Sequence, residues 1–191
     1  MIYLTFNVNI VFCLYSEVLM SGSGVEKFIN SVSFFDAFNE VEKHKFLSGQ
    51  TSFLKFKEND IVFKQGEQGD SLFLVLQGQI GLYRLGEIKS VEGKVSLKKE
   101  VEKHITNLKS GVIFGEVSML TNCKRNVTAR IFSKEVVLMK ISKKLIDSLN
   151  HLTQIKFHRQ LLLSLAIHLD NMNSQFIDLK YEHDEYVKSH S

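Results

Sequence analysis

The spacing of hydrophobic residues divides the chain into a helical section, a β section and a second helical section. Across residues 25–47, apolar residues recur every three or four positions, as on one face of a helix. Ser33 and Asp36 have the spacing of a capping box, which predicts two helices with a boundary near residue 33. After Ser142 the helical spacing returns, first in a short amphipathic segment and then in a long helix over residues 152–173.

The middle section, residues 51–141, is predicted to be β-structure. Its apolar residues alternate with polar ones or form short runs, separated by turn-forming segments. Gly66 and Gly69, three residues apart, predict a tight turn with positive φ. Residues 80–91 and 95–108 predict a long hairpin. About eight strands flanked by helices predict an α+β fold: a β-roll, or jelly-roll-like barrel, with N-terminal helices and a C-terminal helical segment that includes a long helix.

The chain is predicted to have three parts. Residues 1–24 form an N-terminal extension, and Met20 before Ser-Gly-Ser-Gly resembles a second start. Residues 1–19 are then dispensable, or alternatively they pack as an extra strand or helix or contact a membrane. The extension lacks the basic flank and cleavage site of a signal peptide, so no membrane partner is expected. Residues 25–150 form the β-roll with its flanking helices, and residues 151–191 form the long helix and a tail.

Charge and composition narrow the classes of function. A net charge of +3 over 191 residues is too small for a dedicated nucleic-acid surface, so no nucleic-acid partner is expected. Cys13 and Cys123 are too few for a disulfide framework, which favours a cytoplasmic location. The 7 histidines show no metal-ligand spacing, and no nucleophile–base arrangement is present in the sequence. Neither a metal site nor an enzyme is expected.

The candidate chemistry lies in one segment, Phe114–Arg130. Glu116 and Arg125 on a single loop-helix segment suit a small anion that also carries hydroxyl groups. A guanidinium pairs with phosphate oxygens, and a carboxylate accepts from a sugar hydroxyl. The start of the short helix supplies further N–H donors and the positive end of its dipole. The segment therefore predicts a module that binds a cyclic nucleotide.

Two motifs resemble the cyclic nucleotide-binding domain family, over about residues 34–173. One is IVFKQGEQGDSLFLVLQGQIGLY, residues 61–83, which is similar to the family's glycine-marked strand pair. The other is FGEVSML followed by Arg125, which is similar to its phosphate-binding cassette. The resemblance, to Crp-like and protein-kinase-A-regulatory-subunit-like proteins, implies a non-catalytic sensor for cAMP, or alternatively cGMP. The residues after Asn173 leave no room for the DNA-binding module of some members, so a stand-alone domain is expected.

The resemblance also implies a role for each cassette residue. Glu116 would accept from the ribose 2′-OH, and Gly115 would let the backbone approach the sugar. The N–H groups of Val117 and Ser118 would donate to the cyclic phosphate, and Arg125 would pair with its exocyclic oxygens.

Further ligand contacts are less specified by the resemblance. Asn126 is a candidate that can hydrogen-bond the phosphate or the base, or crowd the pocket. Leu72, Val75 and Phe114 are candidates for the pocket wall and are equally expected as core residues.

The sequence leaves the ligand open. Lys124, Asn126 and Val127 depart from the family pattern at positions usually held by Pro and small residues. These departures leave both cAMP and cGMP as candidates. They also support an alternative, a ligand-free structural or interaction module on the same fold.

The predicted helix over residues 152–173 carries apolar residues on more than one face, which implies a second buried contact. A homodimer through this helix and a fold-back of residues 174–191 over it are the two candidates. A signal from the ligand site would then pass through the C-terminal helices to a protein effector that the sequence does not identify.

Overall fold

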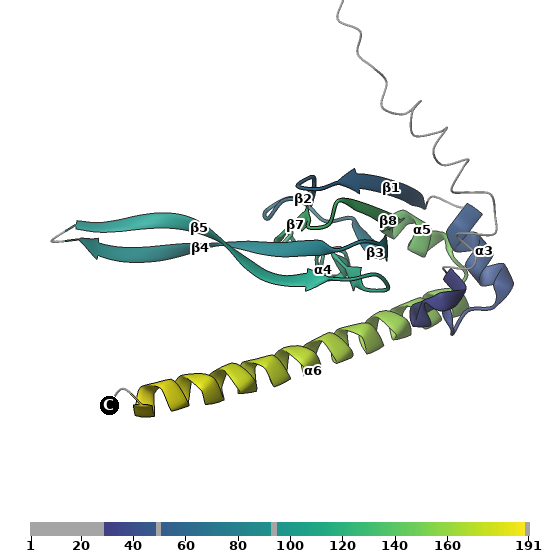
Figure 1. Ribbon diagram of the computed structural model, residues 1–191. Helices are drawn as coiled ribbons and strands as arrows, with labels where there is room; N and C mark the ends of the chain where they lie inside the picture. The colour runs from purple at the N-terminus through teal and green to yellow at the C-terminus, as the bar shows by residue number, and fades with distance from the viewer. Residues whose placement is uncertain (1–28, 49–50, 93–94, 190–191) are drawn as a thin grey trace, which may run out of the picture. The chain divides into compact units, whose positions relative to one another are not determined.

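The computed structural model describes residues 29–48, 51–92 and 95–189, so the predicted N-terminal extension lies outside the described residues. The chain forms two units, one ending at Leu149 and the other beginning at Asn150. The first unit contains the sheets and short helices drawn in Figure 1. The described part of the second unit is one helix, α6 (His151–Ser189).

The described residues form eight strands in two antiparallel sheets, which confirms the predicted β-roll of the α+β class. One sheet has the order β1-β8-β3-β6 and the other β2-β7-β4-β5. The predicted hairpin is confirmed: β4 and β5 pair from Ile80↔Leu108 to Glu92↔Val95, and their outer half extends beyond the other strands (Figure 1). The strands are β1 (Ser52–Lys57), β2 (Ile61–Phe63), β3 (Ser71–Gln77), β4 (Ile80–Glu92), β5 (Val95–Leu108), β6 (Ile113–Phe114), β7 (Thr128–Ile131) and β8 (Glu135–Ser142).

The interior of the roll is filled by alternate residues of these strands. Side chains in a strand point to opposite faces in turn, so every second residue faces the core. On β3 these are Phe73 and Val75, and on β7 they are Ala129 and Ile131. The complete cluster of buried residues is Phe63, Phe73, Val75, Ile80, Phe114, Ala129, Ile131, Val136 and Leu138.

The N-terminal section is divided into two helical parts near residue 33, as predicted, but the residues that cap the second part differ from the prediction. Residues 29–31 are helical, η1 (Ser33–Phe35) is a 3-10 turn, and α3 (Glu40–Ser48) follows. The capping box predicted at Ser33 is wrong, because η1 has Val32 at its N-cap and no side-chain cap. Instead, Asn39 and Glu42 exchange two backbone-to-side-chain hydrogen bonds of 2.9 Å at the start of α3. Asn at an N-cap serves as well as Ser.

The Asn39 cap predicts a measurable stability effect. Asn39→Ala leaves the backbone N–H of Glu42 without its acceptor, and we expect the free energy of unfolding to fall by about 1 kcal/mol. Chemical denaturation measures this value. Glu40→Gln, which removes the charge of an exposed carboxylate in the same helical turn and its ion pair with Lys43 but leaves the cap intact, is the control and should change stability by less than about 0.5 kcal/mol. Equal losses in the two variants would contradict the assigned cap.

Two further helices follow the roll, and the second is longer than the sequence pattern predicted. The short helix α5 (Lys143–Ser148) is capped by the Ser142 hydroxyl, which accepts from the Leu145 N–H. Helix α6 has 39 residues where the pattern predicted an end near Asn173. A fold-back of residues 174–191 is therefore wrong, because residues 174–189 continue the same helix. No helix in the described parts of the chain, α6 included, has an apolar stretch long enough to cross a membrane.

Candidate functional site

The Phe114–Arg130 segment folds as a strand, a left-handed turn and a short helix. β6 ends at Phe114, and Gly115 with a φ of 78° turns the chain into α4 (Glu116–Thr121). α4 ends at Asn122, which has a φ of 54°. A left-handed residue at each end keeps α4 to six residues, and the chain then returns toward β7 through Arg125. The cassette predicted from the sequence is thus a compact unit.

The guanidinium of Arg125 lies at the centre of this unit, where the residue is only 5% exposed. Its Nη1 donates to the carbonyl of Gly115 and to the hydroxyl of Ser118, both at 2.6 Å. Its Nη2 donates to the carbonyl of Ser71 at 2.7 Å. The guanidinium carbon lies 4.2 Å from the ring centroid of Phe63, which adds a cation–π contact. Arg125 thus binds three separate segments of the chain.

One donor of Arg125 is left over. Its buried Nε has no hydrogen-bond partner among the described residues. A buried N–H without an acceptor is unfavourable, and native proteins rarely keep one without a reason. An oxyanion held against this side of the guanidinium would satisfy it. The residues present therefore fit an anionic ligand.

Nearby carboxylates offset the burial of this charge. Burial lowers the pKa of the Arg125 guanidinium from its ordinary value, while Asp70, Glu116 and Glu67 act to raise that pKa. Glu116 is itself buried, with 8% exposure. The structure thus places Glu116 and Arg125 near each other, as their spacing predicted, with an acidic group and a strong cation at one site.

The two sequence motifs meet at this site. The backbone N–H of Arg125 donates to the carbonyl of Glu67 at 2.7 Å, and the N–H of Gly66 donates to the carbonyl of Arg125 at 2.8 Å. Gln68 and Lys124 form a further antiparallel bridge. The glycine-marked loop and the cassette are therefore held together by main-chain hydrogen bonds.

Gly69 belongs to the site, although its role was not predicted. A Cβ at Gly69 would lie 2.3 Å from the Ser118 hydroxyl oxygen and 3.0 Å from the guanidinium carbon of Arg125. Gly66 has the predicted positive φ, of 91°, whereas Gly69 does not. The pair of glycines was the available signal. Of the two glycines, only Gly66 has the positive φ that the turn requires, whereas Gly69 leaves room for the side chains of Ser118 and Arg125.

The other predicted ligand residues differ in exposure. Ser118 is buried, whereas Val117 is 45% exposed and the Asn126 side chain is exposed. Gly115 does more than open the backbone, because a Cβ there would lie 2.7 Å from Nη1 of Arg125. The structure therefore gathers Gly115, Glu116, Ser118 and Arg125 and leaves the side chain of Asn126 at the surface.

The predicted wall residues divide between two faces of β3. Val75 and Phe114 belong to the core cluster of the roll. Leu72 is buried but lies on the opposite face of β3 from Val75, because the two are three positions apart in a regular strand. Phe73, not proposed as a wall, lies on the Val75 face and its ring stacks on Phe114 with centroids 5.3 Å apart.

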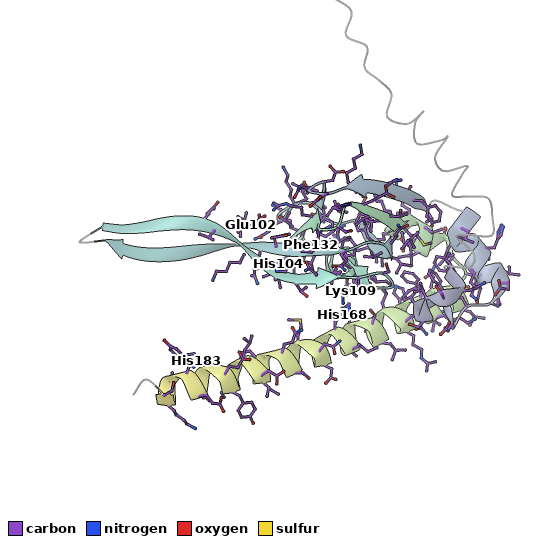
Figure 2. The ribbon with its side chains drawn as sticks, viewed as in Figure 1. Glu102, His104, Lys109, Phe132, His168 and His183 are labelled. Atoms are coloured by element: carbon purple, nitrogen blue, oxygen red, sulfur yellow. The ribbon has the colours of Figure 1, made fainter. Side chains whose placement is uncertain are left out.

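A second polar and aromatic group lies on the outer face of the β2-β7-β4-β5 sheet. Arg130, between the core residues of β7, contacts Glu102 at 2.9 Å and lies 4.8 Å from the Tyr83 ring centroid. The His104 ring contacts the Tyr83 ring, with centroids 5.2 Å apart, and the Phe132 ring at 6.4 Å; His104 and Phe132 are labelled in Figure 2. The described residues contain no cluster of His, Cys, Asp and Glu able to hold a metal. The charge of Arg130 is paired with that of Glu102 inside this group, so the group resembles ordinary surface packing.

A cavity of about 200 Å³ is formed by residues that precede the cassette in the sequence. It is lined by residues of the N-terminal helical section, namely Ile29, Asn30, Glu40, Lys43, His44 and Leu47. Lys43 in this lining already contacts Asn30 and Glu40. The cavity holds none of the predicted ligand residues.

The sequence matches the cyclic nucleotide-binding domain family over residues 53–150, which is 98 of 191 residues. The chain belongs to this family. Apart from Ser52, the first residue of β1, the match covers the eight strands, the glycine-marked loop and the cassette.

Individual relatives agree with this assignment. A cGMP-dependent protein kinase from Eimeria tenella is 28% identical over 122 residues, or 62% of this chain. The chain covers only 11% of that kinase. Among solved structures, a cyclic nucleotide-binding domain from Methylobacillus flagellatus matches with a TM-score of 0.63 and 18% identity, covering 79% of each chain.

Two further structures share the fold. The catabolite activator protein of Thermus thermophilus matches with a TM-score of 0.58 and 22% identity, over 78% of this chain and 63% of that one. The regulatory subunit of a cAMP-independent protein kinase A from Trypanosoma brucei matches with a TM-score of 0.55 and 19% identity, over 72% and 43%. At these identities the structures establish the fold.

Gly115→Ala tests the contact between the glycine and the guanidinium. The new Cβ would strain the left-handed backbone and displace Nη1 of Arg125. Gly111→Ala is the matched control, because Gly111 has a similar φ of 88° but open space at the Cβ position. We expect Gly111→Ala to lower the free energy of unfolding by about 1–2 kcal/mol and Gly115→Ala to lower it further. Equal losses in denaturant titrations would contradict the contact.

Proposed function

We propose that this domain binds a cyclic nucleotide, cAMP or cGMP, at the cassette and relays the binding to a protein effector through its C-terminal helices. The observation that carries the proposal is the buried Arg125, whose Nε–H has no partner among the described residues, while the buried carboxylate of Glu116 is near enough to raise the pKa of the guanidinium. A phosphate would supply the acceptor that the Nε–H of Arg125 lacks, and a carboxylate such as that of Glu116 can accept from a neighbouring sugar hydroxyl.

Each cassette residue has a part in this proposal. Arg125 would bind the exocyclic phosphate oxygens, and Glu116 would accept from the ribose 2′-OH. The backbone N–H groups of Val117 and Ser118 lie in the first turn of α4, where N–H groups have no partner within the helix. They would donate to the phosphate. The exposed side chain of Asn126 would reach the ligand only after a local rearrangement.

The relay is supported by two consecutive carbonyls at the start of β3. The carbonyl of Ser71 accepts from Nη2 of Arg125, while the carbonyl of Asp70 accepts from the N–H of Lys143 at 2.9 Å. Lys143 is the first residue of α5. Movement of the guanidinium toward a phosphate would therefore pull on the strand end that holds α5. The ligand biases the helices only as far as it binds one arrangement more tightly.

Thermal unfolding with each nucleotide tests the ligand. At a concentration 100-fold above its Kd, a nucleotide that binds only the folded state adds about 2.7 kcal/mol of stability. We expect either cAMP or cGMP to raise the unfolding temperature of the wild type, and Arg125→Ala to abolish the shift. Arg130→Ala, which removes an arginine from the outer face of the sheet, is the matched control and should respond as the wild type does.

The opposite outcome would favour a different function. If neither nucleotide shifts the unfolding of a folded wild type, the domain is a ligand-free structural or interaction module on the same fold. Lys124, Asn126 and Val127, which depart from the family pattern, are the residues that support this second candidate.

We further propose that α6 pairs with α6 of a second copy in a coiled coil. Its residues fit a heptad repeat with apolar side chains at most a and d positions. The residues at the a and d positions from Ile155 to Tyr186 are exposed, except for Leu165, which is half-buried. Helix α6 would extend about 58 Å at 1.5 Å per residue, enough for five heptads. The a and d positions are Ile155, His158, Leu162, Leu165, Leu169, Met172, Phe176, Leu179, His183 and Tyr186.

This register extends the predicted dimer surface beyond residues 152–173. Phe176, Leu179 and Tyr186 are 63–68% exposed, and an exposed row of large apolar side chains of this kind marks an interaction surface. His183, near the C-terminal end of α6 in Figure 2, is a polar a position, and polar a positions favour one register over others.

Sedimentation of two lysine variants tests the coiled coil. Leu169→Lys places a charge at an a position and should convert a dimer to a monomer, because two lysines would face each other in the seam. Ser174→Lys places the same charge at an f position, outside the seam, and should remain dimeric. A wild-type chain that sediments as a monomer at tens of micromolar would exclude the dimer.

The cellular location and the kind of protein effector are each proposed from one or two observations. The low cysteine content and the exposed thiol of Cys123 suit a reducing cytoplasm. The exposed Val117 and Leu120, one turn apart on α4, offer an apolar edge whose position would follow the cassette. A protein effector with an apolar contact residue would suit this edge.

A further inference from the structure

We infer that the side-chain hydroxyl of Ser118 is a positioning group for the anion site, in addition to any role of its backbone N–H. The inference rests on the proposed binding of a cyclic nucleotide. The Ser118 hydroxyl is buried between two groups: it donates to the carbonyl of Gly115 at 3.2 Å and accepts from Nη1 of Arg125 at 2.6 Å. A hydroxyl has one donor and can accept, and here both capacities are used.

The hydroxyl helps to determine which donors of Arg125 remain for a ligand. A guanidinium has five N–H groups in one plane. Three of them are directed to Gly115, Ser118 and Ser71. The remaining two are the Nε–H, which has no partner among the described residues, and one N–H of Nη2, the terminal nitrogen on the same edge of the guanidinium as the Nε–H. Two adjacent N–H groups on one edge are the arrangement that binds two oxygens of a phosphate.

Without the Ser118 acceptor, Nη1 keeps only the Gly115 carbonyl, and the plane of the guanidinium is less restricted. The Phe63 ring would still lie 4.2 Å from the guanidinium carbon, but a ring face permits rotation about its normal. The two donors on the guanidinium would keep their fixed directions relative to each other, but the whole group would no longer be held in one orientation in the site. Ser118 thus orients the guanidinium that binds the anion.

Gly69 supplies independent support for this role. A Cβ at Gly69 would meet the Ser118 hydroxyl at 2.3 Å, the Ser118 Cβ at 2.7 Å and the guanidinium carbon at 3.0 Å. Gly69 is not among the positive-φ glycines, so its backbone does not require glycine. The requirement comes from the close approach of the loop to the Ser118–Arg125 pair. Gly69 and Ser118 together form the back of the anion site.

Helical serines often bond a preceding carbonyl for local reasons alone, and α4 contains a matched control for that case. The hydroxyl of Thr121 donates to the carbonyl of Val117 at 2.7 Å and is exposed. Ser118→Ala and Thr121→Ala therefore each remove one hydroxyl-to-carbonyl bond from the same helix. Only Ser118→Ala also removes the acceptor of Arg125.

The experiment measures the Kd of the wild type and the variants for cAMP and cGMP by calorimetry. We expect Ser118→Ala to weaken binding about tenfold, in the range for loss of a hydrogen bond to a charged group, and Thr121→Ala to leave it unchanged. Ser118→Cys has nearly the same volume with a weak acceptor and should resemble Ser118→Ala. Gly69→Ala should weaken binding at least as much.

A double-mutant cycle separates positioning from general destabilisation. Arg125→Lys retains a charge but removes the planar guanidinium that Ser118 would orient, so Ser118→Ala should weaken binding less in that background than in the wild type. Additive losses, or equal losses in Ser118→Ala and Thr121→Ala, would overturn the inference while nucleotide binding by the wild type stands. Failure of the wild type to bind either nucleotide would overturn the proposed function and the inference with it.

Discussion

The buried guanidinium of Arg125 is the interaction on which the site depends. A charge removed from water must be compensated by acceptors and opposite charges. Here two carbonyls and a hydroxyl accept from it, and carboxylates nearby favour its charged form. The acceptors come from the start of β3 and from the cassette, so one side chain joins segments 54 residues apart. The close packing around the guanidinium also explains the glycines at positions 69 and 115, because a Cβ at either position would lie too close to it.

The same arrangement links the cassette to the rest of the chain. Arg125 binds the carbonyl of Ser71, and the neighbouring carbonyl of Asp70 binds the first residue of α5. A change in the hydrogen bonds of the guanidinium would thus alter a strand end that also supports a helix. The outer group around Arg130 has no such connection to the core, because it lies on the solvent face of its sheet.

Much of the fold was predictable because hydrophobic spacing differs between strands and helices. The strands, the β4–β5 hairpin and both helical sections followed from that spacing. Two errors have local causes. Ser33 has a capping residue's identity, but Asn39 and Glu42 form the cap. The end of α6 was predicted too early, near Asn173. The sequence there contains no glycine or proline that would end a helix.

By itself, the sequence predicted the class of site. The Gly-Glu pair, Arg125 and the glycine-marked loop indicated an anion site on a β-roll, because local spacing sets strands, turns and the short helix. Only the tertiary structure decided how the donors of Arg125 are shared. Its acceptor at Ser71 and the clearance at Gly69 arise where distant segments pack together. Such contacts depend on how strands meet in space, which the spacing along one chain does not specify.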